Sequence, residues 1–203
     1  ACEAAPENVT VVEAGSEPAT NLKLDPNEVV VLGEGATINN NLIGDNGTVN
    51  KLFLGNNVTI SNNSLKIEEI WVGGVGNLIE GHVNHEVDIN IGPNAYLRVN
   101  GNINDLQNLN IGANGTLDVG GNVDIWVSAD IATGALLTVD GTLDCNGSPV
   151  VNNNGTVTAG TNNCTLLAAL DGGGSGTNLA SMLPLFALAA LGLAIYVRPR
   201  AKA

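Results

Sequence analysis

Residues 91–103 read IGPNAYLRVNGNI, and residues 111–123 read IGANGTLDVGGNV. The second segment repeats the apolar positions of the first, twenty residues later. Between Ile89 and Asn163 this spacing generates four apolar columns: Ile91, Ile111, Ile131 and Val151; Leu97, Leu117, Leu137 and Val157; Val99, Val119, Val139 and Ala159; Ile103, Val123 and Leu143, ending at Asn163. A fixed repeat of this length is typical of solenoid proteins, in which successive turns of the chain stack on one another.

Turn-forming residues separate the apolar columns. One set recurs at Asn94, Asn114, Gly134 and Asn154, and a second at Asn100, Gly120, Asp140 and Gly160. Because these residue types tolerate positive φ, we expect the same two backbone corners to recur in every turn. Apolar and polar residues alternate within each repeat, as in Leu97-Arg98-Val99, which indicates strands rather than helices.

The repeat continues in a looser form towards the N-terminus. Equivalent glycines are spaced 22, 18, 19 and 20 residues apart, from Gly33 through Gly55, Gly73 and Gly92 to Gly112. The sequence therefore predicts an all-β fold, a parallel β-helix of about seven rungs over residues 21–170. A left-handed helix of hexapeptide repeats has rungs of about eighteen residues, so a spacing of twenty favours the right-handed form.

Composition and charge fit an exported protein with a narrow core. Aromatic residues make up only 3 % of the chain, and there are 26 glycines, which suits a core of stacked aliphatic side chains. All 20 acidic residues lie at or before Asp171, where the chain has only four of its basic residues, giving 4 − 20 = −16. Such a surface repels nucleic acid and favours solubility outside the cell.

The two ends of the chain differ from the repeats. Residues 1–20 form an acidic segment in which the β-prone run Val9–Glu13 either caps the solenoid or adds as a strand to a neighbouring subunit. Residues 171–178 form a glycine-rich hinge. Residues 179–203 contain nineteen uncharged residues up to Val197 and then a basic terminus, which predicts one hydrophobic α-helix able to cross a membrane.

Two parts of the chain resemble known families. The phrase Ile-Gly-x-Asn-x-x-Leu-x-Val-x-Gly-x-Ile/Val, at 91–103 and 111–123, loosely resembles the rungs of bactofilins. That resemblance implies a right-handed β-helix and subunits that stack end to end. Gly172-Gly173-Gly174, the apolar segment and the Arg198/Arg200 end resemble the GlyGly-CTERM type of sorting tail, which implies delivery to a membrane and cleavage there.

The three cysteines fit an exported protein. Cys145 and Cys164 lie nineteen residues apart, nearly one rung, which places them on neighbouring turns about 5 Å apart and predicts a disulfide. The alternative is a pair of buried free thiols. Cys2 is left over, and an odd cysteine in an exported protein suggests a cross-link to another chain. A lipidated cysteine is the alternative.

Several sites carry polar residues that could be modified or bind ions. Candidate sites of N-glycosylation are Asn8, Asn46, Asn57, Asn62, Asn114, Asn154 and Asn163. At 114–116 and 154–156 the Asn-Gly-Thr sequence is also the turn that the rung requires. His82 and His85 lie near Glu80 and Glu86 but lack the convergent ligands of a metal site. Recurrent aspartates lack the repeat that builds calcium rolls: Asp118, Asp124, Asp130, Asp140 and Asp144.

We expect a structural protein rather than an enzyme, because no catalytic constellation, phosphate loop or sugar-binding aromatic platform is present in the sequence. The leading hypothesis is a subunit that self-assembles into an extracellular filament, tube or sheath, exported with its signal peptide removed and needing no cofactor. Its partner is then a second copy of itself, with a membrane contacted through residues 179–197. The alternative is a membrane-anchored surface adhesin in which the same tail only tethers the solenoid.

Overall fold

The computed structural model of the chain describes residues 9–13, 19–43, 50–61, 64–165 and 167–168. The chain divides into two compact units, 1–170 and 171–203. The second unit lies outside the described residues, and with it the expected hinge and hydrophobic helix.

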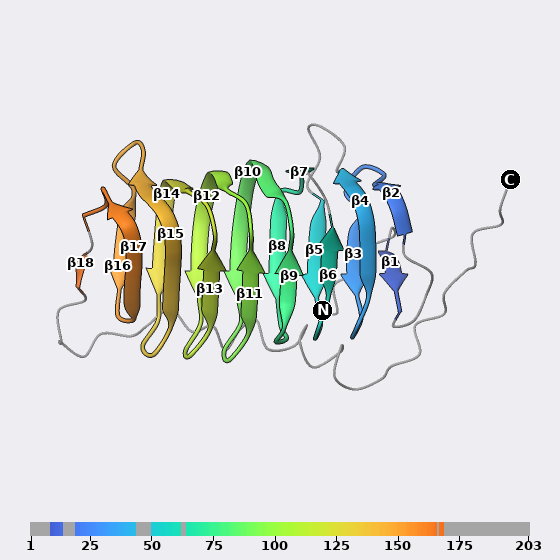
Figure 1. Cartoon of the computed structure of the whole chain (residues 1–203), viewed down its shortest axis with the longest axis horizontal. Helices are drawn as coiled ribbons and strands as arrows, with labels where there is room; N and C mark the ends of the chain where they lie inside the picture. Colours follow the sequence, from blue (N-terminus) through green and yellow to red (C-terminus); the bar gives the residue numbers. More distant parts are fainter. Residues whose placement is uncertain (1–8, 14–18, 44–49, 62–63, 166, 169–203) are drawn as a thin grey trace, which may run out of the picture. The chain divides into compact units, whose positions relative to one another are not determined.

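The described residues form eighteen strands (Figure 1). Their bounds are β1 Val9–Val12, β2 Ala19–Lys23, β3 Val29–Leu32, β4 Thr37–Ile43, β5 Lys51–Leu54, β6 Thr59–Ser61, β7 Ser64–Leu65, β8 Glu69–Val72, β9 Asn77–Ile79, β10 His82–Ile91, β11 Tyr96–Val99, β12 Ile103–Ile111, β13 Thr116–Val119, β14 Val123–Ile131, β15 Leu136–Cys145, β16 Val150–Asn153, β17 Thr156–Asn162 and β18 Leu167–Ala168. No helix occurs among these residues, so the all-β prediction is confirmed for this part of the chain.

Each strand pairs in parallel with the strand one turn away, and the predicted solenoid of about seven turns is confirmed. The pairings form three sheets. Sheet 1 contains β1, β3, β5, β8, β16, β18 and the last residues of β10, β12 and β14. Sheet 2 contains the starts of β2, β4, β15 and β17 with β6, β9, β11 and β13. Sheet 3 contains β7, the starts of β10, β12 and β14, and the ends of β2, β4, β15 and β17.

The apolar columns predicted from the repeat fill the interior. Leu97 pairs with Leu117 and Leu117 with Leu137, and all three side chains are fully buried. Within the strands, buried and half-buried residues alternate, as period-two side chains on a sheet must. The fourth column ends differently from the prediction: Leu143 pairs with Asn162, not Asn163, because the register shifts at the corner after Val139.

Positive φ recurs at one of the two predicted corners. Asn94, Asn114 and Gly134 have φ of 59°, 56° and 75°, whereas Asn154 is not in this conformation. At the other corner the expectation of positive φ is wrong for all four residues, Asn100, Gly120, Asp140 and Gly160. That corner recurs because consecutive turns approach each other closely there.

Candidate functional site

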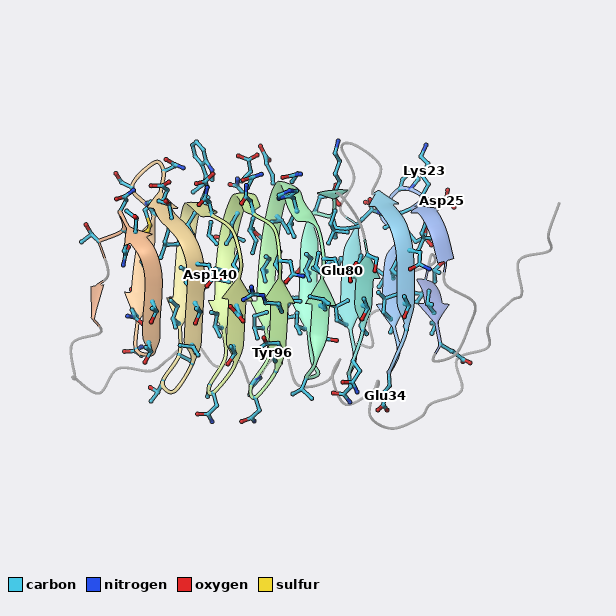
Figure 2. All side chains as sticks on the ribbon, viewed as in Figure 1. Lys23, Asp25, Glu34, Glu80, Tyr96 and Asp140 are labelled. Carbon is cyan, nitrogen blue, oxygen red and sulfur yellow. A yellow bond between two sulfur atoms is a disulfide. The ribbon has the colours of Figure 1, made fainter. Side chains whose placement is uncertain are left out.

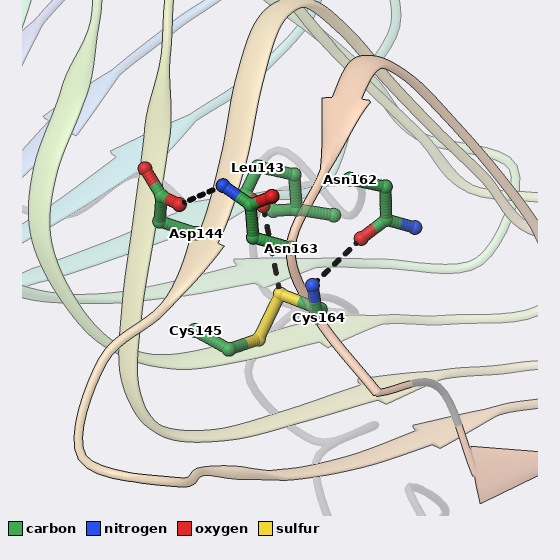
Figure 3. Close-up of a disulfide and its surroundings, with 6 residues drawn as sticks. All are labelled: Leu143, Asp144, Cys145, Asn162, Asn163 and Cys164. Atoms are coloured by element: carbon green, nitrogen blue, oxygen red, sulfur yellow. Dashed lines mark hydrogen bonds between the residues drawn. A yellow bond between two sulfur atoms is a disulfide. The ribbon is translucent and has the colours of Figure 1, made fainter.

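The last two turns are joined by a disulfide (Figure 3). Cys145 in β15 and Cys164 after β17 form it, with their Cα atoms 5.0 Å apart and a sequence separation of 19. Beside it the Asn163 side chain donates a hydrogen bond of 2.6 Å to Asp144, and the Cys164 N–H donates to the Asn162 side chain. This is the pairing that the spacing predicts, and it ties the end of the solenoid to the turn before it.

Cys2, the expected intermolecular cross-link, lies outside the described residues. So do three of the candidate glycosylation sites, Asn8, Asn46 and Asn62. The other four, Asn57, Asn114, Asn154 and Asn163, are exposed.

Two of these exposed sequons double as structural corners. Asn57 and Asn114 have φ of 55° and 56°, so their backbone conformation is one that the turn itself requires. The Asn114 side chain also bonds to that of Asn94, at 3.4 Å. The structure thus accounts for asparagine at these two positions without any modification.

A glycine ladder forms the corner between sheets 2 and 3. The N–H of Gly101 donates to the carbonyl of Gly81, that of Gly121 to Gly101, and that of Gly141 to Gly121, each at 3.1 Å. A Cβ atom on Gly121 would lie 2.8 Å from the Gly101 carbonyl oxygen. Only glycine therefore allows these turns to approach so closely.

Side chains cap the same corner from the neighbouring position. His82 Nδ1 accepts a hydrogen bond from the Asn102 N–H at 2.9 Å, and Asn102 and Asn122 accept in the same way from the next turn. His82 therefore accepts a hydrogen bond from the backbone of the next turn. In the sequence this ladder is visible as Gly-Asn pairs twenty residues apart, at 101–102 and 121–122, but residue type alone does not reveal the close approach of the turns.

Polar side chains also lie on the outside of the sheets (Figure 2), where several bond from one turn to the next. On sheet 1, Asn108 bonds to Asp88 and Ser128 bonds to Asn108, at 2.8 Å each. Asn90 and Asn110 are joined in the same way at 2.8 Å. These side chains bond to the equivalent position of the next turn, so they stabilise the stack rather than converge on one point.

One charged network lies on sheet 2, and sequence reasoning missed it. The Arg98 guanidinium contacts the carboxylates of Asp118 and Asp140, the latter at 3.3 Å, and Tyr96 donates to Asp118 at 3.2 Å. Burial, followed by the nearby Asp118 charge, raises the pKa of the Tyr96 hydroxyl. Arg98 neutralises aspartates from two following turns, which indicates a structural role for two of the recurrent aspartates.

Three aspartates lie near one another on sheet 3, in the described part of the chain. Asp124 pairs in register with Asp144, and Asp105 lies near enough to act on it. Burial, and then the charges of Asp144 and Asp105, raise the pKa of Asp124. Across the described ranges, no group of three or more histidine, cysteine, aspartate or glutamate side chains has the geometry to hold a metal ion.

The two ends of the solenoid leave core-facing side chains half-buried. Val157 and Ala159 of β17 follow Leu137 and Val139 of β15 in register. The β15 residues are 0 % and 1 % exposed, whereas those of β17 are only partly buried.

The first turn shows the same feature, since Val12 and Leu22 are also only partly buried. β1 pairs in parallel with β3 of its own chain. Of the features described, the two ends are the best candidates for a functional surface.

No protein-family model, no curated protein and no solved structure matches the chain. The resemblances to bactofilin rungs and to GlyGly-CTERM tails therefore stay predictions from the residues alone. In the described residues, no helix is long and apolar enough to cross a membrane. Residues 179–197, where a spanning helix is expected, lie outside them.

Proposed function

We propose that this chain is a non-enzymatic, exported structural subunit that assembles with copies of itself into an extracellular filament, tube or sheath. The β-helix, taken as right-handed because its C-terminal turns repeat every twenty residues, lies on the outside. Residues 179–203 form a helix that packs within the assembly or in a membrane. The assembly needs no cofactor.

The observation that carries this proposal is the state of the end turns. In a solenoid each turn is stabilised by the turns beside it, and a terminal turn needs a polar cap or a neighbour. Val157 and Ala159 face the core direction yet remain half-buried, as do Val12 and Leu22 at the other end. A second copy of the chain presents the same kind of parallel strands and aliphatic side chains that each end lacks.

A second candidate function rests on the outside of sheet 1. Val31, Phe53 and Trp71 follow one another in register on its outer side. The Phe53 and Trp71 rings stack with centroids 6.1 Å apart and planes 12° apart. From β10 onward the same column is polar, starting at Asn90.

Half-buried apolar side chains gathered on the outside of a sheet can form part of a surface that binds a partner. It favours an anchored adhesin, in which residues 179–197 only tether the displayed solenoid.

Electron microscopy of material sheared from intact cells, with mass spectrometry of the purified protein, tests the two functions. The structural proposal expects regular filaments or tubes that contain the full-length chain, tail included. A monomer confined to the membrane fraction, or cut near Gly172–Gly176, would contradict it.

Deletion of residues 178–203 separates the functions further. In a filament the deletion abolishes polymers, because the tail helices pack the subunits together. In an adhesin the deletion releases a soluble monomer that still binds its partner. Cells that express the unmodified chain at the same level provide the control.

A further inference from the structure

The last turn of the solenoid carries no charge. From Cys145 to Leu170 the sequence contains no aspartate, glutamate, lysine, arginine or histidine, in a chain with 20 acidic residues. Its strand β17, Thr156–Asn162, passes from sheet 2 to sheet 3 and is seven residues rich in threonine. Proteins normally protect an exposed edge strand with charged side chains or proline, because its unpaired backbone groups recruit other strands.

Among the described strands, β17 pairs only with β15, so its other edge, called the free edge, faces away from the preceding turns. The Thr156 N–H donates to the Ala135 carbonyl at 2.9 Å. The residues of β17 whose side chains face outward, such as Thr156, therefore direct their backbone N–H and C=O groups towards β15. The same rule holds in the interior, where Thr116 donates to Ala95 and Gly120 to Val99. Backbone groups in a parallel strand alternate between its two neighbours, so Val157 and Ala159 direct theirs to the free edge.

The first turn offers a matching edge. β2 passes from sheet 2 to sheet 3 over Ala19–Lys23, and β17 passes between the same two sheets over Thr156–Asn162. Both strands run in the same direction as every other strand of the solenoid. Thr20 pairs with Asn39 of the following turn and occupies the same position in its turn as Asn100 does. The Asn100 N–H donates to Ile79 of the preceding turn, so the Thr20 N–H likewise points towards the N-terminal end of the solenoid.

We propose that β17 is the docking strand for β2 of a second copy, which extends the parallel ladder head to tail. This inference rests on the proposed self-assembly and names the surface that performs it. The contact is heterologous, because each copy offers one edge of each kind, and such a contact repeats into an open filament.

The register has a consequence for sheet 1. When β2 of one copy lies directly on β17 of another, only one strand position remains between β16 and β3 of the next copy. Two strands compete for this position. β18 of the first copy fills it by pairing with Asn152 and Asn153, and β1 of the next copy fills it by pairing with β3. β1 has four paired residues and β18 has two, so in the assembly β1 replaces β18.

Proline substitutions in the full-length chain test this contact. Ala159→Pro removes an N–H that faces the free edge while leaving the bonds from β17 to β15 in place, because those come from the alternate residues. Thr20→Pro likewise removes an N–H that faces the exposed edge of β2, at the opposite end of the solenoid. Ala159→Ser keeps the N–H and is the matched control. Circular dichroism of each variant at low concentration verifies that the solenoid is folded.

Assembly is measured by light scattering and electron microscopy over a concentration series. We expect each proline variant alone to remain monomeric, and an equimolar mixture of the two to stop at a dimer with one intact contact. In assembled wild-type protein, the amide of Ala159, which lies in the column of Ala19 at the start of β2, should exchange at least about tenfold more slowly than in the monomer.

The outcomes separate the contact from the function. If wild-type protein forms no polymer at any concentration, the proposed function and this contact both fail. If wild-type protein polymerises and Ala159→Pro polymerises equally well, only the contact is wrong. An Ala159 amide already slow in the monomer would show that residues of the same chain cover β17, which also overturns the contact.

Discussion

The residue type tolerated at single positions of this chain depends mainly on how closely the preceding turn approaches. At the corner between sheets 2 and 3, Gly121 lies against the carbonyl of Gly101, and an added Cβ would also lie 2.1 Å from the Asn102 side-chain oxygen. At Gly55 the nearest atom, the Leu32 carbonyl oxygen, would lie at 3.1 Å. Neither glycine has positive φ, so the two positions differ in the space available.

Gly121→Ala should lower the free energy of unfolding by about 2–3 kcal/mol, because backbone from the neighbouring turn must move. Gly55→Ala, which requires a shift of only a few tenths of an ångström, should cost about 1 kcal/mol or less. Urea denaturation followed by circular dichroism measures both. Equal losses would show that glycine flexibility, not contact, decides these positions.

The raised pKa of Asp124 makes a prediction about pH. A carboxyl group whose pKa is higher in the folded state favours folding when protonated and opposes it when ionised. Asp124→Asn should therefore stabilise the protein at pH 7, and this gain should vanish below the ordinary value of 3.8. Asparagine there also continues the ladder in which Asn104 bonds to Asn84.

Asp118→Asn provides the opposite case, because Asp118 pairs with Arg98 and the substitution removes that pair. It should destabilise the protein at pH 7. Urea denaturation of both variants at pH 3 and pH 7 distinguishes them. A stabilisation by Asp124→Asn that is the same at both pH values would contradict the assignment.

At the scale of strands and turns, the sequence predicts what repeats and misses what does not. The columns through Leu97 and Val99 follow directly from period-two alternation at a spacing of twenty. Positive φ at Asn94 and Asn114 follows from residue type, but residue type alone could not show that the other corner depends on close contact at Gly101. The Arg98 network was missed because it joins residues from three different turns, and only the register brings them together.

The disulfide acts at the same scale. In the chain-entropy model, closing a loop of this size stabilises a fold by about 3 kcal/mol. Cys145→Ser/Cys164→Ser should lose about that much, with the earliest hydrogen exchange in β16 and β17. Cys2→Ser is the matched control and should leave stability unchanged. Loss of protection spread evenly over all turns would contradict a local role for the bond.

At the scale of the whole molecule, charge opposes assembly. Residues 1–171 carry 4 − 20 = −16, so stacked copies repel one another. Salt screens such repulsion beyond about 8–10 Å at physiological ionic strength. Polymers should therefore form at lower protein concentration in 0.5 M than in 0.01 M sodium chloride. Sedimentation over a concentration series measures this, with the proline variant Ala159→Pro as the non-assembling control. A critical concentration that rises with salt would indicate that charge attraction drives the contact.

The position of the disulfide also matters under mechanical load. A solenoid that is pulled from one end peels apart turn by turn, because each turn contacts only its neighbours. A pull on the chain beyond Ala168 first separates β18 from β16; it then reaches Cys164, where the covalent bond transfers the tension to Cys145 in the turn before. Tension applied through the tail then spares β16 and β17, which lie between the two cysteines, and the force needed to open the structure is set by the interior turns.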